Sequence, residues 1–297
     1  MSNSRILITG GTGFIGKNLC AKLSEMGHDL VVLTRNKNLK NTKKLKFIND
    51  LEEVEFDFDI VINLAGAPIS VRWNKKNCDE IYNSRIETTR KIVAKINSAK
   101  NPPKALISGS AIGYYGTSET TIFNEKSLPT KQNYFSQKLC FDWEEEAKKA
   151  TNKTRVVILR TGAVLGKDGG IIKKMKLPFQ LGLGGKIGSG KQYLSWIHID
   201  DVVSAIIEIA FNNNSIGTVN LVAPNPVTNS EFSQALAKTL NRPCLFMIPA
   251  ISMKIVYKEM ASELLIEGQK VYPKSLLSQN FSFKYEEISK ALEEILY

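Results

Sequence analysis

The stretch Thr9-Gly10-Gly11-Thr12-Gly13-Phe14-Ile15-Gly16 decides the fold of this chain. It follows directly on the apolar run from Arg5 to Ile8 and leads into a helix-like stretch from Lys17 to Gly27. A strand, a glycine turn and a helix arrive in the order that a nucleotide-binding βα unit requires. The sequence therefore predicts a dinucleotide site at its N-terminal end.

Each glycine of this turn has its own expected task. Gly10 permits the tight turn, Gly13 leaves room for the pyrophosphate to approach the backbone, and Gly16 lets the helix pack closely on the strand. The N–H groups at the start of the helix then meet the phosphates, because the helix dipole favours negative charge there. The predicted cofactor contacts are Gly10, Thr12, Gly13, Phe14, Ile15 and Gly16. The alternative is a glycine turn with a structural role alone.

The second expected strand, Asp29 to Thr34, selects the dinucleotide. NAD-specific proteins place an acid near its end to bind the ribose hydroxyls, but this chain has Thr34 and Arg35 there. The guanidinium of Arg35 can pair with a 2′-phosphate, and Lys37 and Lys40 add positive charge to the loop. NADP(H) is therefore favoured, with contacts from Thr34 and Arg35. An ordinary solvated basic loop is the alternative.

Length and composition indicate a globular protein. The chain has 297 residues, of which 43% are hydrophobic, enough for a proper core. It contains no apolar run of about 18 residues, and it enters a strand at once. We expect a soluble cytoplasmic enzyme that does not enter a membrane. The four cysteines lie far apart, without a CxxC pair, so reduced and buried thiols are expected.

The net charge of +11 raises the possibility of a nucleic-acid partner. The excess consists mostly of lysines scattered along the chain, and no aromatic-interleaved basic motif accompanies them. A specific nucleic-acid site is therefore not expected. With two histidines and no cysteine cluster, no metal site is expected either.

The remaining pattern alternates apolar runs with helical stretches, which favours an α/β doubly wound parallel sheet. A strand at 193–197 and a helix from Asp200 or Asp201 to Phe211 are expected to return to this sheet, with the aspartates as N-caps. Further strands are expected at 45–48, 58–63, 104–108, 154–161 and 218–222, and further helices at 75–99, 133–150 and 229–240.

The segment from Gly166 to Gly190 breaks this regularity, because it contains eight glycines. It predicts a mobile connection around one short helix that lines the substrate cleft. The expected division is a Rossmann domain over 1–165, with 190–225 returning to the sheet. A smaller, mostly helical substrate lobe would then comprise 166–189 and 226–297.

The chain resembles the extended short-chain dehydrogenase/reductase superfamily, and within it an atypical epimerase-like group with a distinctive C-terminal segment. The resemblance covers nearly the whole chain and implies an NADP(H)-binding α/β protein whose substrate is poorly defined for the group. It rests on TGGTGFIG (9–16), NLAGAPI (63–69), RW (72–73), SRIETTR (84–90), SAIGYYG (110–116), CFDWE (140–144), RTGAVLGKDGG (160–170), GLGGKIGSGKQYLSWIHIDD (182–201) and APNPVTN (223–229).

The resemblance implies a catalytic trio of Ser110, Tyr134 and Lys138. In the superfamily a hydroxyl holds the substrate oxygen, a tyrosine exchanges its proton, and a lysine four residues later lowers the pKa of the tyrosine. Residues four apart share one face of a helix, so Lys138 is expected beside the phenol of Tyr134. The spacing is also a common coincidence in a lysine-rich chain, and relatives often carry other residues there.

Other polar positions are better suited to binding than to catalysis. Asn63, Ala65 and Gly66 lie at or beyond the end of the fourth strand, where a bare backbone can border the adenosine ribose; a plain strand-end turn is the alternative. Arg85 and Arg160 are either cleft residues or buried ion-pair partners. Tyr193 and Trp196 are expected in the core, and His198 is expected to make structural hydrogen bonds.

One departure from the epimerases concerns the substrate. Many sugar-nucleotide epimerases have an arginine where this chain has Leu194, and an apolar side chain cannot bind a diphosphate. Lys186 or Lys191 could replace it only as a point charge. The sequence thus favours an NADP(H)-dependent oxidoreductase or epimerase-like enzyme acting on a small carbonyl or hydroxyl compound. A non-catalytic NADP(H)-sensing regulator and a sugar-nucleotide epimerase are the rivals.

Overall fold

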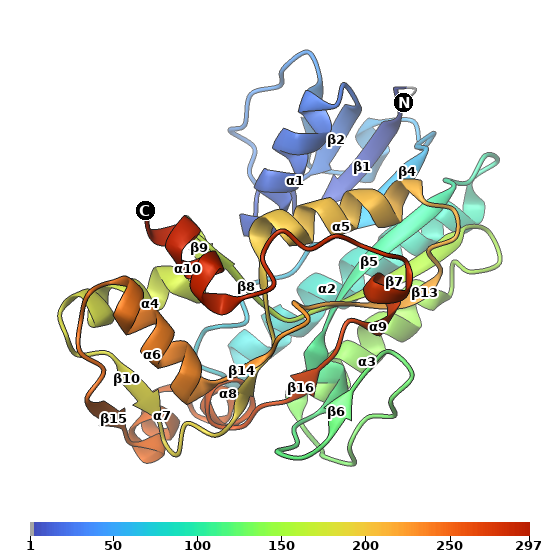
Figure 1. Ribbon diagram of the computed structural model, residues 1–297. Coiled ribbons are helices and arrows are strands. Elements are labelled where there is room, and N and C mark those ends of the chain that lie inside the picture. The colour runs from blue at the N-terminus through green and yellow to red at the C-terminus, as the bar shows by residue number, and fades with distance from the viewer. Residues whose placement is uncertain (1–2) are drawn as a thin grey trace.

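The computed structural model describes residues 3–297 and is built around a seven-stranded parallel sheet (Figure 1). The strands follow one another in the order β3-β2-β1-β4-β5-β7-β13, so the predicted doubly wound α/β fold is confirmed. Their bounds are β1 (Arg5–Thr9), β2 (Asp29–Leu33), β3 (Leu45–Ile48), β4 (Ile60–Asn63), β5 (Ala105–Ala111), β7 (Arg155–Thr161) and β13 (Gly217–Leu221).

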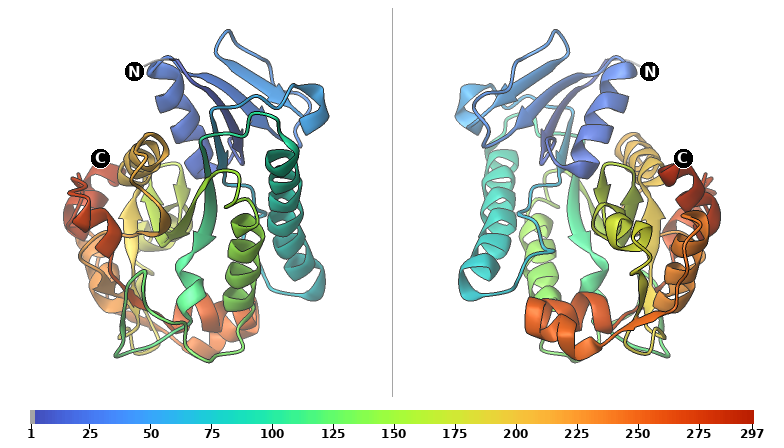
Figure 2. Two further views of the ribbon diagram at one scale, coloured as in Figure 1. Left: turned by 90° about the vertical axis from the view of Figure 1, so that its right-hand side faces the viewer. Right: turned by 90° about the vertical axis from the view of Figure 1, so that its left-hand side faces the viewer.

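Helices cover both faces of this sheet (Figure 2). Helices α1 (Phe14–Glu25) and α5 (Ile199–Phe211) lie on one face, and α2 (Lys75–Ser98) and α3 (Phe135–Lys148) lie on the other. Successive residues of a strand point to opposite faces. Ile8 of β1 therefore packs with α1 and α5, whereas Leu7 packs with α2.

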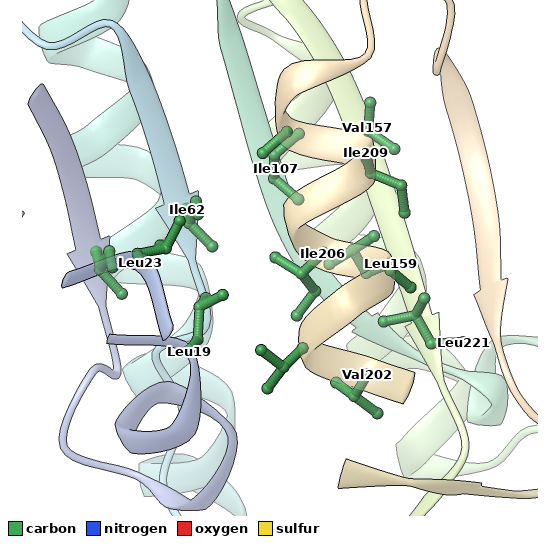
Figure 3. Close-up of a cluster of buried hydrophobic side chains, with 14 of the residues drawn as sticks. Leu19, Leu23, Ile62, Ile107, Val157, Leu159, Val202, Ile206, Ile209 and Leu221 are labelled. Atoms are coloured by element: carbon green, nitrogen blue, oxygen red, sulfur yellow. The ribbon is translucent and has the colours of Figure 1, made fainter. Parts of the chain in front are cut away.

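The larger apolar cluster joins α1, the sheet and α5 (Figure 3). Leu19 and Leu23 of α1 and Ile206 of α5 are fully buried in it. Burying one such side chain contributes about 1.5–3 kcal/mol, so this cluster fixes α1, and with it the glycine turn, against the sheet.

The turn after β1 lies at the place where the chain changes direction across the sheet. Strand β1 pairs with β2 on one side and with β4 on the other, with Thr9 opposite both Leu33 and Asn63. In open parallel sheets a crevice forms outside the carboxyl ends of the strands at such a point, and ligands bind there.

The expected strand at 193–197 does not join this sheet. It is divided into β11 (Tyr193–Leu194), which pairs with β14 (Val227–Thr228), and β12 (Trp196–His198), which pairs with β8 (Ala163–Gly166). The prediction was wrong because an apolar run does not say which strand it pairs with. Within 190–225, α5 and β13 return to the main sheet.

The start of α5 also differs from the expectation. His198 is the N-cap, and its Nδ1 accepts from the backbone N–H of Asp200 at 3.1 Å. Asp201 instead accepts from the N–H groups of Lys284 and Tyr285, which ties the C-terminal segment to α5. The structural role expected for His198 is confirmed, and the aspartate caps were wrong.

The glycine-rich stretch is closely packed. Carbon atoms added at Gly166 and Gly169 would lie 2.6 and 2.3 Å from the ring of Phe14, and one at Gly184 would lie 2.4 Å from Phe179. Here the glycines allow close approach to aromatic rings. The stretch forms β9 (Gly169–Gly170), α4 (Ile172–Gln180) and β10 (Gly185–Ile187).

A second apolar cluster lies beside the main sheet, around Trp196 and Phe232, which are both fully buried. It is formed mainly by α4, α6 (Asn229–Thr239) and α10 (Ile288–Leu296), seen together in Figure 1. The remaining elements of the C-terminal segment lie outside this cluster and have these bounds: β15 (Phe246–Ile248), α7 (Ala250–Tyr257), α8 (Glu259–Ala261), the π-helix η3 (Ser262–Ile266), β16 (Lys270–Val271) and α9 (Lys274–Ser278). Strand β16 pairs with β6 (Ile122–Phe123), and α9 packs beside β13. Two short 3-10 helices, η1 (Leu51–Glu53) and η2 (Ile112–Tyr115), complete the elements.

All four cysteines are free thiols, as expected. Cys20 and Cys140 are buried, whereas Cys78 and Cys244 are only half-buried. No helix within residues 3–297 is long and apolar enough to cross a membrane.

Candidate functional site

The three glycines of the turn have different surroundings. Gly10 has a φ of +71°, and an added Cβ would lie 2.4 Å from the carbonyl oxygen of Leu64. At Gly16 an added Cβ would lie 2.2 Å from the oxygen of Gly10. Both positions therefore accept only glycine. At Gly13 the φ is −78°, and an added Cβ would lie 3.2 Å from the Gly10 carbonyl oxygen, a tighter contact than usual but far less severe than those at Gly10 and Gly16.

The N-terminus of α1 is open to a ligand. Its N-cap is Gly13, no side chain caps it within residues 3–297, and its first turn contains no acid. Thr12 and Gly13 are exposed, and Phe14 and Ile15 are half-buried. Free N–H groups at a helix N-terminus, together with the helix dipole, favour an anion.

The loop after β2 presents Arg35 to solvent. Its side chain is 84% exposed, and Glu80 of α2 lies 3.7 Å away. An exposed pair at this distance contributes little, so Arg35 stays available to a phosphate. Thr34 is buried, and its hydroxyl accepts from the N–H of Asn36 at 3.2 Å. Thr34 therefore shapes the loop that carries Arg35.

Asn63 is fully buried, and its side chain makes hydrogen bonds within the protein, while the backbone contact expected at Asn63, Ala65 and Gly66 stays a prediction. Its Oδ1 accepts from the hydroxyl of Thr9 at 2.6 Å, and its Nδ2 donates to the hydroxyl of Thr89 at 2.8 Å. The N–H of Ala65 also donates to Thr9, at 3.2 Å. Asn63 thus orders the carboxyl edge of the sheet, and Gly66 beyond it is exposed.

Ser110 belongs to a buried ion pair. Its hydroxyl donates to Glu144 at 2.8 Å, and Glu144 also accepts two hydrogen bonds of 2.8 Å from Arg160. The Arg160 guanidinium lies 3.4 Å from the centroid of the Tyr114 ring. Of the two alternatives for Arg160, the structure therefore shows the buried ion-pair partner.

Tyr134 is the N-cap residue of α3, and its carbonyl oxygen accepts from the N–H of Lys138 at 3.1 Å. Its hydroxyl donates to Glu267 at 2.5 Å, and the same carboxylate accepts from Thr117. The hydrogen bond to Glu267 and burial raise the pKa of Tyr134. The lowered pKa expected from Lys138 was wrong in this arrangement.

Lys138 has other partners. Its ammonium lies 2.5 Å from Asp142 and 5.7 Å from the centre of the Tyr82 ring, and it is 67% exposed. The hydrogen bond to Asp142 raises the pKa of Lys138. No hydrogen bond within residues 3–297 joins Ser110, Tyr134 and Lys138, so the three do not form a trio here. Their catalytic roles stay predictions.

The carboxylates that bind these residues were missed by the sequence reasoning. Glu144 lies within the CFDWE motif, which singled it out without a partner. Glu267 and Glu263 come from the C-terminal segment, more than 120 residues from their partners. Glu263 accepts from the N–H groups of Phe135 and Ser136 and so caps α3. No local pattern in the sequence indicates these contacts.

Two of the surface hollows bear on the location of the site. The smaller, of about 510 Å³, lies beside Tyr134 and Lys138, under Glu259, Glu263 and Glu267. The larger, of about 800 Å³, is lined by Lys104, Arg155 and Gly217 at the amino ends of β5, β7 and β13. It lies at the sheet edge opposite the glycine turn and is therefore not the cofactor crevice. Within residues 3–297, no group of three or more histidine, cysteine, aspartate or glutamate side chains is arranged to hold a metal ion.

Comparisons with known proteins agree over the whole chain. Residues 6–222 match the family model described as the NAD dependent epimerase/dehydratase family, and residues 248–295 match a domain of unknown function, DUF1731. The chain is 41% identical to the Arabidopsis thaliana epimerase family protein SDR39U1 homolog, chloroplastic, covering 99% of this chain and 87% of the relative. It is 35% identical to the epimerase family protein SAR0825 of Staphylococcus aureus strain MRSA252, covering 98% of each.

A solved structure is also similar to this protein along nearly its whole length. The human epimerase family protein SDR39U1 (isoform2), crystallised with NADPH, superposes with a TM-score of 0.90 at 36% sequence identity. The match covers 98% of each chain. The similarity therefore includes both the sheet and the C-terminal segment.

Proposed function

The chain belongs to the NAD dependent epimerase/dehydratase family, and from this premise we propose that it binds NADP(H) at the carboxyl edge of the sheet. The observation that carries the proposal is the exposed Gly13, which has an extended backbone and precedes the uncapped N-terminus of α1. A side chain there would fill the approach that a pyrophosphate needs. Gly10 and Gly16 fix the turn around it.

The phosphorylated cofactor is preferred because of Arg35. Its exposed guanidinium follows β2, where it can reach a 2′-phosphate. The similar human protein was crystallised with NADPH, which supports the same preference. Phe14 and Ile15 would contribute their backbone N–H groups to the phosphates.

The proposed reaction is an oxidoreduction or epimerisation of a small carbonyl or hydroxyl compound. NADP(H), when bound, supplies or accepts a hydride. Tyr134 moves a proton at its hydroxyl oxygen, which requires Glu267 to release that hydroxyl. Ser110 would orient the substrate oxygen only if its hydroxyl left Glu144. Lys138 likewise acts on Tyr134 only after it leaves Asp142.

These existing contacts favour a second candidate function, an NADP(H)-sensing protein without catalysis. In that case Tyr134 and Glu267 hold the C-terminal segment against α3. A partner protein would bind differently to the cofactor-bound and cofactor-free forms. A sugar-nucleotide epimerase has less support, because Leu194 packs with the second apolar cluster at the place of the expected phosphate ligand.

Titration calorimetry with Arg35→Ala tests the cofactor assignment. A hydrogen bond to a charged group contributes about 1.5–3 kcal/mol, so the variant should bind NADPH about ten- to a hundredfold more weakly and bind NADH nearly as before. Lys40→Ala removes a charge from the same loop and is the matched control, with a smaller loss expected. An equal loss for both cofactors in Arg35→Ala contradicts the 2′-phosphate assignment.

A further inference from the structure

Arg85 ties the loop after β4 to helix α2. Its Nη1 donates to the carbonyl oxygens of Ala67 at 3.1 Å and of Ile81 at 2.9 Å. The neighbouring Ser84 accepts from the N–H of Ala67 at 2.8 Å. The guanidinium is therefore held in one orientation, at the edge of the sheet where the cofactor is proposed to bind.

Two glycines make room for this guanidinium and the ring beneath it. The Arg85 Cζ lies 5.3 Å from the centroid of the Trp143 ring. A Cβ added at Gly66 would lie 2.7 Å from that Cζ, and one added at Gly109 would lie 2.9 Å from the Trp143 ring. A side chain at either glycine would displace the pair, so the backbone of β5 and of the loop after β4 accommodates it.

Within the part of the chain that the structure describes, the positive charge of Arg85 has no counter-ion. Its bonded acceptors are carbonyl oxygens, and no carboxylate within residues 3–297 lies within 4.0 Å of it. Arg160, by contrast, pairs with Glu144. Burial lowers the pKa of Arg85. A half-buried guanidinium without a carboxylate is costly, and an anion would offset that cost.

One edge of the guanidinium is open. Within residues 3–297, Nε and Nη2 of Arg85 donate no hydrogen bond to the protein. Both nitrogens also remain accessible to solvent. Within residues 3–297, the side-chain nitrogens that are fully buried and make no hydrogen bond are His28 Nε2 and Arg160 Nη1, and the Arg85 nitrogens are not among them. The open edge lies against exposed Gly66, two residues beyond the Leu64 carbonyl that abuts Gly10.

We propose that the Nε and Nη2 edge of Arg85 binds an oxyanion, a phosphate or carboxylate group of the ligand at the carboxyl edge of the sheet. The planar fork of a guanidinium matches two oxygens of such a group. The proposal rests on the proposed cofactor site for its location. The oxyanion belongs either to the cofactor pyrophosphate or to an acidic substrate, which would then be a carbonyl or hydroxyl compound bearing a phosphate or carboxylate.

Inorganic phosphate is the probe, added at constant ionic strength to protein with and without saturating NADPH. Binding is followed by thermal unfolding and by tryptophan fluorescence, to which Trp143 contributes. Arg85→Gln should weaken phosphate binding about ten- to a hundredfold, whereas the exposed Arg72→Gln, which removes the same charge, should leave it nearly unchanged. NADPH affinity is measured separately for each variant.

The two sources give different results. A phosphate effect that persists in the NADPH-loaded protein, with NADPH affinity of Arg85→Gln kept within about twofold, supports an acidic substrate. A loss of NADPH affinity of about ten- to a hundredfold supports the cofactor pyrophosphate. Equal phosphate and NADPH affinities in Arg85→Gln and the wild type overturn the proposal.

Arg85→Lys is a second, more conservative variant, which tests the proposal if Arg85→Gln does not fold. It keeps the charge but loses the fork, so phosphate or NADPH binding should weaken about fivefold or more, and unchanged affinity for both overturns the proposal. A wild-type protein that fails to bind NADPH contradicts the proposed function alone. The phosphate titration of the cofactor-free variants then still tests Arg85.

Discussion

The glycine turn and the start of α3 differ in what their polar groups do. At the turn, the N-terminus of α1 has no capping side chain within the described chain, and Thr12 and Gly13 are exposed. Around α3, each predicted catalytic side chain already has a carboxylate partner: Glu144 for Ser110, Glu267 for Tyr134 and Asp142 for Lys138. One region is ready to bind a ligand, whereas the other must first break internal contacts.

This difference separates binding from chemistry. The turn depends on backbone geometry, which the fold supplies before any ligand arrives. Proton transfer by the predicted trio of Ser110, Tyr134 and Lys138 depends instead on side chains. Their existing hydrogen bonds to charged acceptors contribute about 1.5–3 kcal/mol each. Cofactor binding therefore follows from the fold, and proton transfer by Tyr134 requires a rearrangement that the ligand must stabilise.

The largest expected effect is at Gly13. Gly13→Val should abolish binding of both NADPH and NADH, because the side chain fills the approach of the pyrophosphate. The backbone at Gly13 has a φ of −78° and a ψ of 178°, which valine adopts readily, so the variant should fold. Calorimetry measures the binding, and thermal unfolding checks the fold.

Gly16→Ala is the contrasting variant. Its Cβ would lie 2.2 Å from the Gly10 oxygen, against 3.2 Å for a Cβ at Gly13, so Gly16→Ala should lower the unfolding temperature more than Gly13→Val does. Normal NADPH binding by folded Gly13→Val would mean that the cofactor lies elsewhere.

The next effect concerns Tyr134. A carbonyl substrate is first found by screening for NADPH oxidation. If Tyr134 transfers the proton, Tyr134→Phe should lower the turnover of that substrate by roughly 10²–10⁴. NADPH affinity should stay within about 1 kcal/mol, because only a hydroxyl is removed. Steady-state kinetics and calorimetry measure the two quantities.

Tyr82→Phe is the matched control for that loss. The Tyr82 hydroxyl also donates to a carboxylate, that of Asp142 at 2.8 Å, and it is likewise half-buried. The control should cost similar stability and retain turnover. Full activity in Tyr134→Phe would remove the dehydrogenase mechanism and favour the sensing protein.

The sequence was sufficient for the sheet and the turn because their determinants are local. An apolar run, three glycines at fixed spacing and a helical stretch specify β1 and α1 without distant residues. The family resemblance, drawn from such motifs, is confirmed by the family model over residues 6–222.

The partners of the predicted catalytic side chains could not be predicted in the same way. Tyr134 and Glu267 are separated by 133 residues, and the spacing of Tyr134 and Lys138 gives no sign of a third partner. The helix begins at Phe135, one residue after Tyr134, and the side chains of Tyr134 and Lys138 each bind a different carboxylate, Glu267 and Asp142. The strand pairing of 193–197 failed for the same reason, since pairing partners are not local.

The smallest expected effect is at Lys258, where the segment that covers Tyr134 begins. Lys258 has a φ of +54° and a ψ of −135°, between α7 and α8, a conformation that favours glycine. Strain of this kind costs of order 1–3 kcal/mol, and glycine adds about 0.5–1 kcal/mol of unfolded-state entropy, so Lys258→Gly should stabilise the protein by about 1 kcal/mol.

Asn280→Gly is the control for that gain, because Asn280 also has a positive φ, of 58°, but asparagine tolerates that region. Thermal unfolding should show a higher midpoint for Lys258→Gly and little change for Asn280→Gly. Neither change touches the glycine turn, so NADPH affinity should stay at the wild-type value in both. A lower midpoint for Lys258→Gly would show that the lysine side chain holds the segment over Tyr134 by contacts that outweigh the backbone strain.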